Sequence, residues 1–122
     1  MIVLDSSIWF TYFSDNLAKV RGLIDSDIEV SCSVITLFEI KRLFLKQGLM
    51  RQKMEKYLSF IRTRSIIVDV KKHVADRAAE LSFVHDLSTA DAIIYATAQE
   101  RSAELWTRYS DFEGLKGVVI VQ

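Results

Sequence analysis

Short apolar runs and longer stretches with helical spacing alternate along the chain. The short runs, several of them rich in β-branched residues, predict five strands that are largely buried. The expected strands are Met1–Leu4, Ile28–Ser31, Ser65–Val70, Ala103–Thr107 and Val118–Val121. No linker or repeat divides the sequence, so residues 1–122 are expected to form one domain.

The stretches between these strands carry apolar residues every three or four positions, which indicates helices with one buried face. Helices are expected directly after the first strand, at Asn16–Ile24, from Ser33 to about Gln47, at about Met50–Thr63, at Val74–Val84 and within Ser88–Glu100. Helical crossovers between strands favour a parallel sheet with helices over both faces. The predicted fold class is therefore α/β, with a five-stranded parallel sheet.

The stretch Ser88–Glu100 predicts a helix that is buried nearly all round. Ser88 and Thr89 can each cap a helix start, and the small and apolar residues after them cover almost the whole helix surface. Asp91 then places a carboxylate in the first turn of a buried helix. Such a charge has to be satisfied by backbone donors, by a cation or by a metal ion.

Three more acids lie near the starts of elements that leave the same edge of the predicted sheet. Asp5 follows the first strand, Glu39 lies early in the helix after the second, and Asp111 follows the fourth. Each has a structural alternative, because Asp5 can cap a helix, Thr36-Leu-Phe-Glu39 fits a capping box and Asp111 suits a turn. Since parallel sheets bind ligands at the carboxyl ends of their strands, the four acids are expected to form a carboxylate cluster.

Clustered carboxylates repel one another unless a cation lies between them, and oxygen ligands without His or Cys indicate Mg²⁺ or Mn²⁺. His73 and His85 lack the spacing of zinc ligands. A divalent ion can lower the pKa of a bound water, neutralise a phosphate and stabilise a leaving oxygen. The residues therefore predict a metal site that acts on a phosphodiester.

Net charge is zero, but ten basic residues and only two acidic ones lie between Lys41 and Lys72. One interpretation of this run is a solvated helix face. The other is a cationic rim that binds a polyanion. The residues expected to contact its phosphates are Arg51, Lys53, Lys56, Arg62 and Arg64.

The single Cys32 lies on an apolar stretch and is interpreted as a small core residue, not as a nucleophile. After Met1, the apolar run before Asp5 consists only of Ile2, Val3 and Leu4, and no later run reaches the eighteen or so apolar residues of a membrane span. A cytoplasmic protein without membrane contact is therefore expected.

Four stretches, in this order, resemble the PIN-domain ribonucleases, and among these the VapC-type toxins of toxin–antitoxin pairs. They are Val3-Leu4-Asp5-Ser6-Ser7, Glu39 in Ser33-Val-Ile-Thr-Leu-Phe-Glu39-Ile, Ala90-Asp91-Ala-Ile-Ile-Tyr-Ala-Thr-Ala98, and Thr107 with Asp111-Phe112. The resemblance spans the whole chain. It implies a Mg²⁺- or Mn²⁺-dependent endoribonuclease, a homodimer, and neutralisation by a small VapB-type antitoxin that also binds operator DNA.

Carried over by position, Asp5, Glu39 and Asp91 correspond to three metal-site acids of the family, and Asp111 lies in its fourth acidic motif. The resemblance implies that Asp5, Asp91 and Asp111 hold the ion. Glu39 would bind it directly or through water and help to orient the nucleophile.

The last motif departs from the family pattern. That pattern is commonly Thr-x-Asp-x-Asp-Phe, and here Tyr109 occupies the first Asp position, which favours a three-acid, one-ion site over a two-ion site. Ser7 and Thr107 would orient ligands or water, unless they only cap a helix or end a strand. Two alternatives are a catalytically silent PIN-like interaction module and a haloacid-dehalogenase-type phosphatase, whose Asp-x-Asp motif Ser7 interrupts.

The implied homodimer needs an apolar surface. Several large apolar residues exceed what one small domain readily hides, and some of them are expected at a two-fold interface. They are Trp9, Phe10, Tyr12, Phe13, Leu45 and Leu49.

Overall fold

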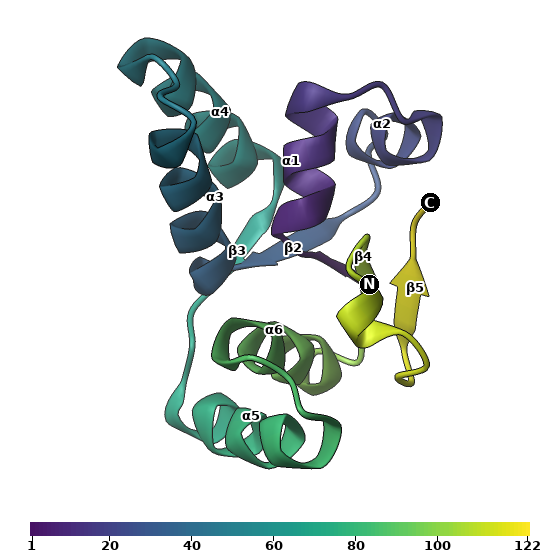
Figure 1. The fold of residues 1–122 in the computed structure, drawn as a ribbon. Coiled ribbons are helices and arrows are strands. Elements are labelled where there is room, and N and C mark those ends of the chain that lie inside the picture. Colours follow the sequence, from purple (N-terminus) through teal and green to yellow (C-terminus); the bar gives the residue numbers. More distant parts are fainter.

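The computed structural model describes residues 1–122 and contains one sheet of five parallel strands (Figure 1). The strands are β1 (Ile2–Leu4), β2 (Val30–Ser33), β3 (Ile66–Val68), β4 (Glu104–Thr107) and β5 (Val118–Ile120). Their order across the sheet is β3-β2-β1-β4-β5. The chain thus builds outward from β1 in both directions, and the carboxyl ends of β1 and β4 mark the point where sheets of this kind bind ligands.

Six α-helices and one 3₁₀ turn connect the strands. They are α1 (Ser6–Ser14), α2 (Ala18–Ile24), α3 (Val34–Lys46), α4 (Arg51–Arg64), α5 (Lys72–His85), α6 (Thr89–Glu100) and η1 (Ser110–Phe112). Figure 1 shows α1 to α4 on one side of the sheet and α5 with α6 on the other. None of these helices combines the length and the apolar character that a membrane crossing requires.

Two hydrophobic cores lie on the two faces of the sheet, because successive side chains of a strand point in opposite directions. Leu4 and Cys32 pack with the helices α1 to α4, whereas Val3 and Leu105 pack with α5 and α6. Cys32 is fully buried, and this burial raises the pKa of its thiol to about 12. Its predicted place in the core is therefore confirmed.

The predicted fold class, a five-stranded parallel α/β sheet covered on both faces, is confirmed. The largest difference concerns β2, which begins at Val30 and not at Ile28. Ile28 is 51% exposed, and its carbonyl oxygen accepts a hydrogen bond from Arg64 Nη2 at 2.7 Å, so it belongs to the loop. β2 consequently extends to Ser33, which caps α3 by accepting the Ile35 N–H at 3.2 Å.

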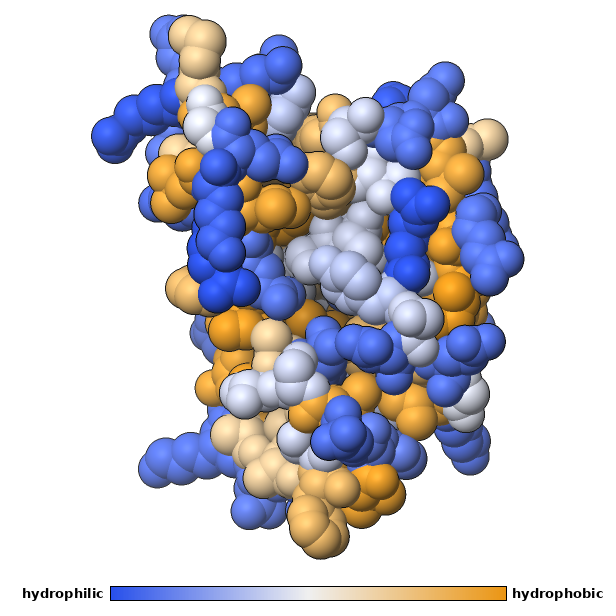
Figure 2. All heavy atoms as spheres, viewed as in Figure 1, coloured by the Kyte–Doolittle hydropathy of each residue, from blue (hydrophilic) through white to orange (hydrophobic).

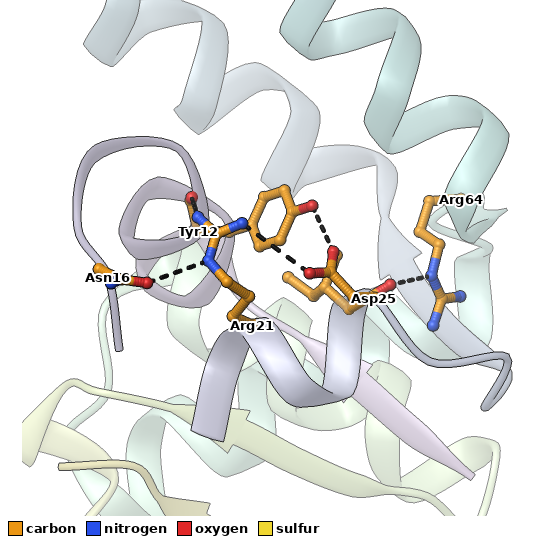
Figure 3. A network of polar contacts seen from close by, with 6 residues as sticks. Tyr12, Asn16, Arg21, Asp25 and Arg64 are labelled. Atoms are coloured by element: carbon orange, nitrogen blue, oxygen red, sulfur yellow. Dashed lines mark hydrogen bonds and ion pairs between the residues drawn. The ribbon is translucent and has the colours of Figure 1, made fainter. Parts of the chain in front are cut away.

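A polar network ties α1, α2 and α4 together beside the amino end of β2 (Figure 3). Tyr12 Oη donates to Asp25 Oδ1 at 2.6 Å, and Arg21 Nη2 donates to the Tyr12 carbonyl at 3.2 Å. Arg64, at the end of α4, donates to four main-chain carbonyls of α2 and the loop after it. The acceptors are Leu23, Ile24, Ser26 and Ile28, at 2.7 to 3.3 Å.

Candidate active site at the carboxyl edge of the sheet

Asp5 lies directly after β1 and has no exposed surface. Its Oδ1 accepts the main-chain N–H groups of Ser7 at 3.0 Å and Ile8 at 3.4 Å, so Asp5 is the N-cap of α1. The cap alternative foreseen from the sequence is therefore realised. It does not exclude a ligand role, because the second carboxylate oxygen takes no part in the cap.

Two hydroxyl groups hold the Asp5 carboxylate from both sides. Ser7 Oγ donates to Oδ1 at 2.5 Å, and Thr107 Oγ1, at the end of β4, donates to Oδ2. Each hydroxyl oxygen also accepts a main-chain N–H, from Arg108 to Ser7 at 2.9 Å and from Tyr109 to Thr107 at 3.0 Å. Both hydroxyl hydrogens are therefore donated to Asp5. Oδ2 of Asp5 accepts one hydrogen bond and can still bind a further ligand.

Burial raises the pKa of Asp5 from its ordinary 3.8 to about 6, although the hydrogen bonds from Ser7, Thr107 and Ile8 oppose the shift. Desolvation disfavours the charged form of a carboxyl group, and here it outweighs four donors. The site therefore holds an anion that its own surroundings do not fully stabilise.

Glu39 lies in the second turn of α3, so the capping-box alternative is wrong: the helix starts at Val34 and Ser33 is its cap. Thr36 is fully buried inside the helix, with no partner for its hydroxyl. Glu39 Oε1 is likewise buried without a hydrogen-bond partner. Burial, then the negative charges of Asp91 and Asp5, raise the pKa of Glu39.

Asp91 lies in the first turn of α6, where Ser88 Oγ caps the helix by accepting the Asp91 N–H at 3.3 Å. The predicted burial of this helix is confirmed, because Ala92 and every residue from Ile94 to Ala98 are buried. Burial is the largest cause of the raised pKa of Asp91, and the negative charge of Asp111 adds to it. The Ser88 hydroxyl opposes this shift. Asp111 itself is exposed in η1.

Asp91 and Asp5 thus lie near enough to Glu39, and Asp111 near enough to Asp91, for their charges to raise these pKa values. Around the middle of Figure 1 lie the starts of α1, α3 and α6, and the same part of the surface is hollowed and weakly polar in Figure 2. No group of three or more carboxylate, histidine or cysteine side chains has the spacing of ligands around one ion. The unpartnered oxygen of Glu39 and the oxygen-only donor set nevertheless fit a hard divalent cation.

Tyr109 and Ser6 belong to this site, although the sequence pattern alone assigns a role to neither. Tyr109 Oη lies 3.3 Å from Ser6 Oγ, and Ser6 is buried. Burial, and to a lesser degree the charges of Asp5, Glu39 and Asp91, raise the pKa of Tyr109. Its position in place of a family acid was the only signal in the sequence.

The basic residues predicted to contact phosphates fall into two groups. Arg51, Lys53 and Lys56 are exposed on α4. Arg62 and Arg64 lie in its last turn, directly before β3 begins and thus near the amino edge, away from the acids. The four hydrogen bonds of Arg64 to main-chain carbonyls give this guanidinium a structural role, so we leave Arg64 out of any RNA-binding surface.

The aromatic residues expected at a dimer interface mostly serve the fold. Trp9 is fully buried, while Phe10, Tyr12, Phe13 and Leu49 pack partly buried against the first core. Tyr12 stacks on Phe60 with ring centroids 5.5 Å apart, and Phe13 stacks on Tyr57 at 4.2 Å. Of the six, Leu45 alone is largely exposed, at 59%. Trp9 is therefore no interface residue, and for the other five the dimer interface stays a prediction.

Residues 2–117 match the PIN domain family, and the chain therefore belongs to that family. No curated protein sequence matches the chain. Among similar solved structures is a toxin–antitoxin complex from Klebsiella pneumoniae, 29% identical, with a TM-score of 0.79 over 98% of this chain and 96% of that one.

Two further solved structures share the fold at lower identity. VapC20 of Mycobacterium tuberculosis, a toxin that cleaves the sarcin-ricin loop, is 20% identical with a TM-score of 0.76 over 100% of this chain and 99% of that one. VapBC2 of Rickettsia felis, bound to a fragment of its promoter DNA, is 17% identical with a TM-score of 0.78 over 99% and 98%.

Proposed function

We propose that this chain is the toxin of a type II toxin–antitoxin pair and acts in the cytoplasm as a Mg²⁺- or Mn²⁺-dependent endoribonuclease. The observation that carries the proposal is that acids from separate elements at the carboxyl edge of a PIN-family sheet raise one another's pKa: Asp5 and Asp91 act on Glu39, and Asp111 acts on Asp91. PIN-domain toxins of the VapC type are nucleases, and PIN-domain nucleases generally use divalent metal ions.

Asp5, Asp91 and Asp111 would hold the ion, with Glu39 binding it directly or through water. The ion, when bound, would lower the pKa of a water molecule and neutralise the phosphate under attack. Asp5 is available for this through Oδ2, since Oδ1 is filled by the cap of α1.

The chain's own groups would orient the reaction. Ser7 and Thr107 keep Asp5 in one rotamer by donating to its two oxygens. Glu39, with an unpartnered oxygen and a raised pKa, is suited to accept the proton of the attacking water as general base. Arg108 is exposed and donates from Nη1 to Thr11 Oγ1 at 3.0 Å, and its remaining N–H groups would be available to a phosphate of the RNA.

The partners follow from the same proposal. A VapB-type antitoxin would bind the chain and would carry the pair to operator DNA, as in the toxin–antitoxin and promoter-bound structures that share the fold. Two copies would form a homodimer, for which Leu45 and the partly buried Phe10, Tyr12, Phe13 and Leu49 still offer apolar surface. We expect the purified protein to sediment as a dimer at micromolar concentration, and a monomer there would contradict this part of the proposal.

The decisive experiment incubates the protein with labelled structured RNA in Mn²⁺ or in chelator, beside a small phosphomonoester. We expect Mn²⁺-dependent RNA cleavage and no release of phosphate from the monoester. Glu55→Gln, at an exposed acid on α4, is the matched control and should cleave like wild type. Hydrolysis of the phosphomonoester alone would indicate a phosphatase. If neither the RNA nor the phosphomonoester is hydrolysed, the result would indicate an interaction module.

A further inference from the structure

Tyr109 occupies an unusual place in the acid site. Its main-chain N–H donates to Thr107 Oγ1 at 3.0 Å, which fixes the backbone directly after β4. Its hydroxyl reaches the buried Ser6 Oγ at 3.3 Å, among the charges of the acid cluster, while 42% of the residue stays exposed. The hydroxyl of Tyr109 therefore lies near the acids, while a substantial part of the residue is in contact with solvent.

The hydroxyl of Tyr109 makes fewer hydrogen bonds than the neighbouring hydroxyls of Ser7 and Thr107. Ser7 and Thr107 give their hydrogens to Asp5, and their oxygens accept main-chain N–H groups. Tyr109 shares a single 3.3 Å contact with Ser6, in which either oxygen can be the donor. It can give up that contact for a stronger acceptor, and a phosphate oxygen is such an acceptor.

A carboxylate at this position would repel a phosphate, whereas a phenol adds no charge and offers a hydrogen. The exposure of the residue adds a second property, because aromatic side chains that reach solvent at nucleic-acid sites stack on unpaired bases. Both properties concern the same ligand, a single-stranded segment of RNA whose phosphate lies at the acids and whose base lies at the rim.

We infer that Tyr109 is a substrate-binding residue. Its ring stacks on the nucleobase beside the scissile phosphodiester, and its hydroxyl donates to that phosphate. This inference rests on the proposed function, since it names a further contact for the same RNA.

The test compares Tyr109→Phe, which keeps the ring, with Tyr109→Leu, which keeps apolar bulk without a stacking face. Binding of single-stranded RNA carrying 2-aminopurine is measured in Ca²⁺, with intact RNA verified at the end, and cleavage is measured in Mn²⁺. We expect Tyr109→Leu to bind about tenfold or more weaker and to lose 2-aminopurine quenching. Tyr109→Phe should bind within about threefold of wild type and lose turnover, because one donor to phosphate is gone.

Two controls separate substrate binding from structural support. Phe83→Leu alters an aromatic ring that is 91% exposed on α5 and should change neither affinity nor quenching. Mn²⁺ affinity, measured by calorimetry without RNA, should be unchanged in both Tyr109 variants. The inference would be overturned, with the proposed function left standing, if Tyr109→Leu kept wild-type RNA affinity and quenching. The same holds if Tyr109→Leu lost Mn²⁺ affinity as strongly as RNA affinity. A wild-type protein that neither binds nor cleaves RNA would overturn the proposed function and this inference with it.

Discussion

Charged side chains at the two edges of the sheet differ in how completely the chain itself satisfies them. At the amino edge, the Arg64 guanidinium donates to four main-chain carbonyls, so the cation and the loop before β2 satisfy each other. At the carboxyl edge, Glu39 keeps a buried oxygen without a partner, and the pKa of Asp5 is raised to about 6. Arg64 is thus paired within the chain, whereas the unpaired oxygen of Glu39 supports the ligand site proposed for the carboxyl edge.

The largest expected effect tests whether the carboxyl edge is catalytic. Asp91→Asn is isosteric and removes only the charge that would hold the ion. We expect RNA cleavage to fall by roughly a thousandfold or more, because losing a metal ligand removes several kcal/mol of transition-state stabilisation. Growth inhibition should disappear with it, while the circular dichroism spectrum stays that of wild type. Normal cleavage by this variant would remove Asp91 from the site.

The second prediction concerns the stability of the metal-free protein as pH changes. The folded pKa of Asp5, about 6, lies above its ordinary 3.8, so the folded form binds the proton more tightly. The resulting stabilisation is fully present below pH 3.8 and is lost as pH rises through 6, by roughly 3 kcal/mol at most. The raised pKa values of Glu39 and Asp91 act in the same direction. Thermal melts in chelator should therefore give a lower Tm at about pH 7.5 than at about pH 5.

Mn²⁺ should offset this loss, adding roughly 2.7 kcal/mol when free metal is a hundred times Kd. Asp5→Asn should show a flatter pH dependence and gain little from Mn²⁺. In chelator, Asp5→Asn should gain only limited stability over wild type, because an amide nitrogen cannot accept the hydrogen that Thr107 donates. Equal responses of wild type and Asp5→Asn to Mn²⁺ would leave Asp5 with its cap role alone.

The third prediction breaks the amino edge. Arg64→Met keeps the apolar stem and removes the guanidinium, so four carbonyls are left without their charged donor. We expect the free energy of unfolding to fall by about 2 kcal/mol, measured in urea, with little change in RNA affinity. The control is Arg62→Met, which replaces an exposed arginine in the same turn. It should change the free energy of unfolding by less than about 0.5 kcal/mol.

The smallest expected effect concerns the exposed cations on α4. Replacing Arg51, Lys53 and Lys56 with Gln should weaken RNA binding and flatten its dependence on salt, by about 0.7 units of the log–log slope for each phosphate that the protein no longer neutralises. Affinity is measured by fluorescence anisotropy over a range of salt concentrations. An unchanged slope would return these residues to the solvated helix face.

Much of the fold could be predicted because its signals are local. Short apolar runs separated by helical spacing specify a parallel sheet, and five runs became five strands. The boundary of β2 could not be predicted, because it depends on Arg64, a residue 36 positions further along that binds the Ile28 carbonyl. A hydrogen bond between elements so distant in the chain leaves no periodic trace in the sequence.

The candidate site divides in the same way. Asp5, Glu39, Asp91 and Asp111 could be chosen because acids at the starts of elements meet at one sheet edge. The direction of the hydrogen bonds around Asp5 could not be predicted, since it depends on which main-chain N–H groups Ser7 and Thr107 accept. The packing of Tyr12 and Phe13 could not be predicted for a related reason, because composition does not reveal that Phe60 and Tyr57 of α4 stack on them.

The N-cap role of Asp5 has a consequence for selection in a living host. If the chain is toxic, clones that survive its expression carry inactivating changes. A change at Asp5 removes a helix cap worth about 1 kcal/mol and strands the donors that it served, so such clones should contain less protein. Changes at Glu39, whose buried Oε1 has no hydrogen-bond partner, should leave a stable, abundant and harmless chain. Immunoblots of surviving clones would then sort the two acids by protein level.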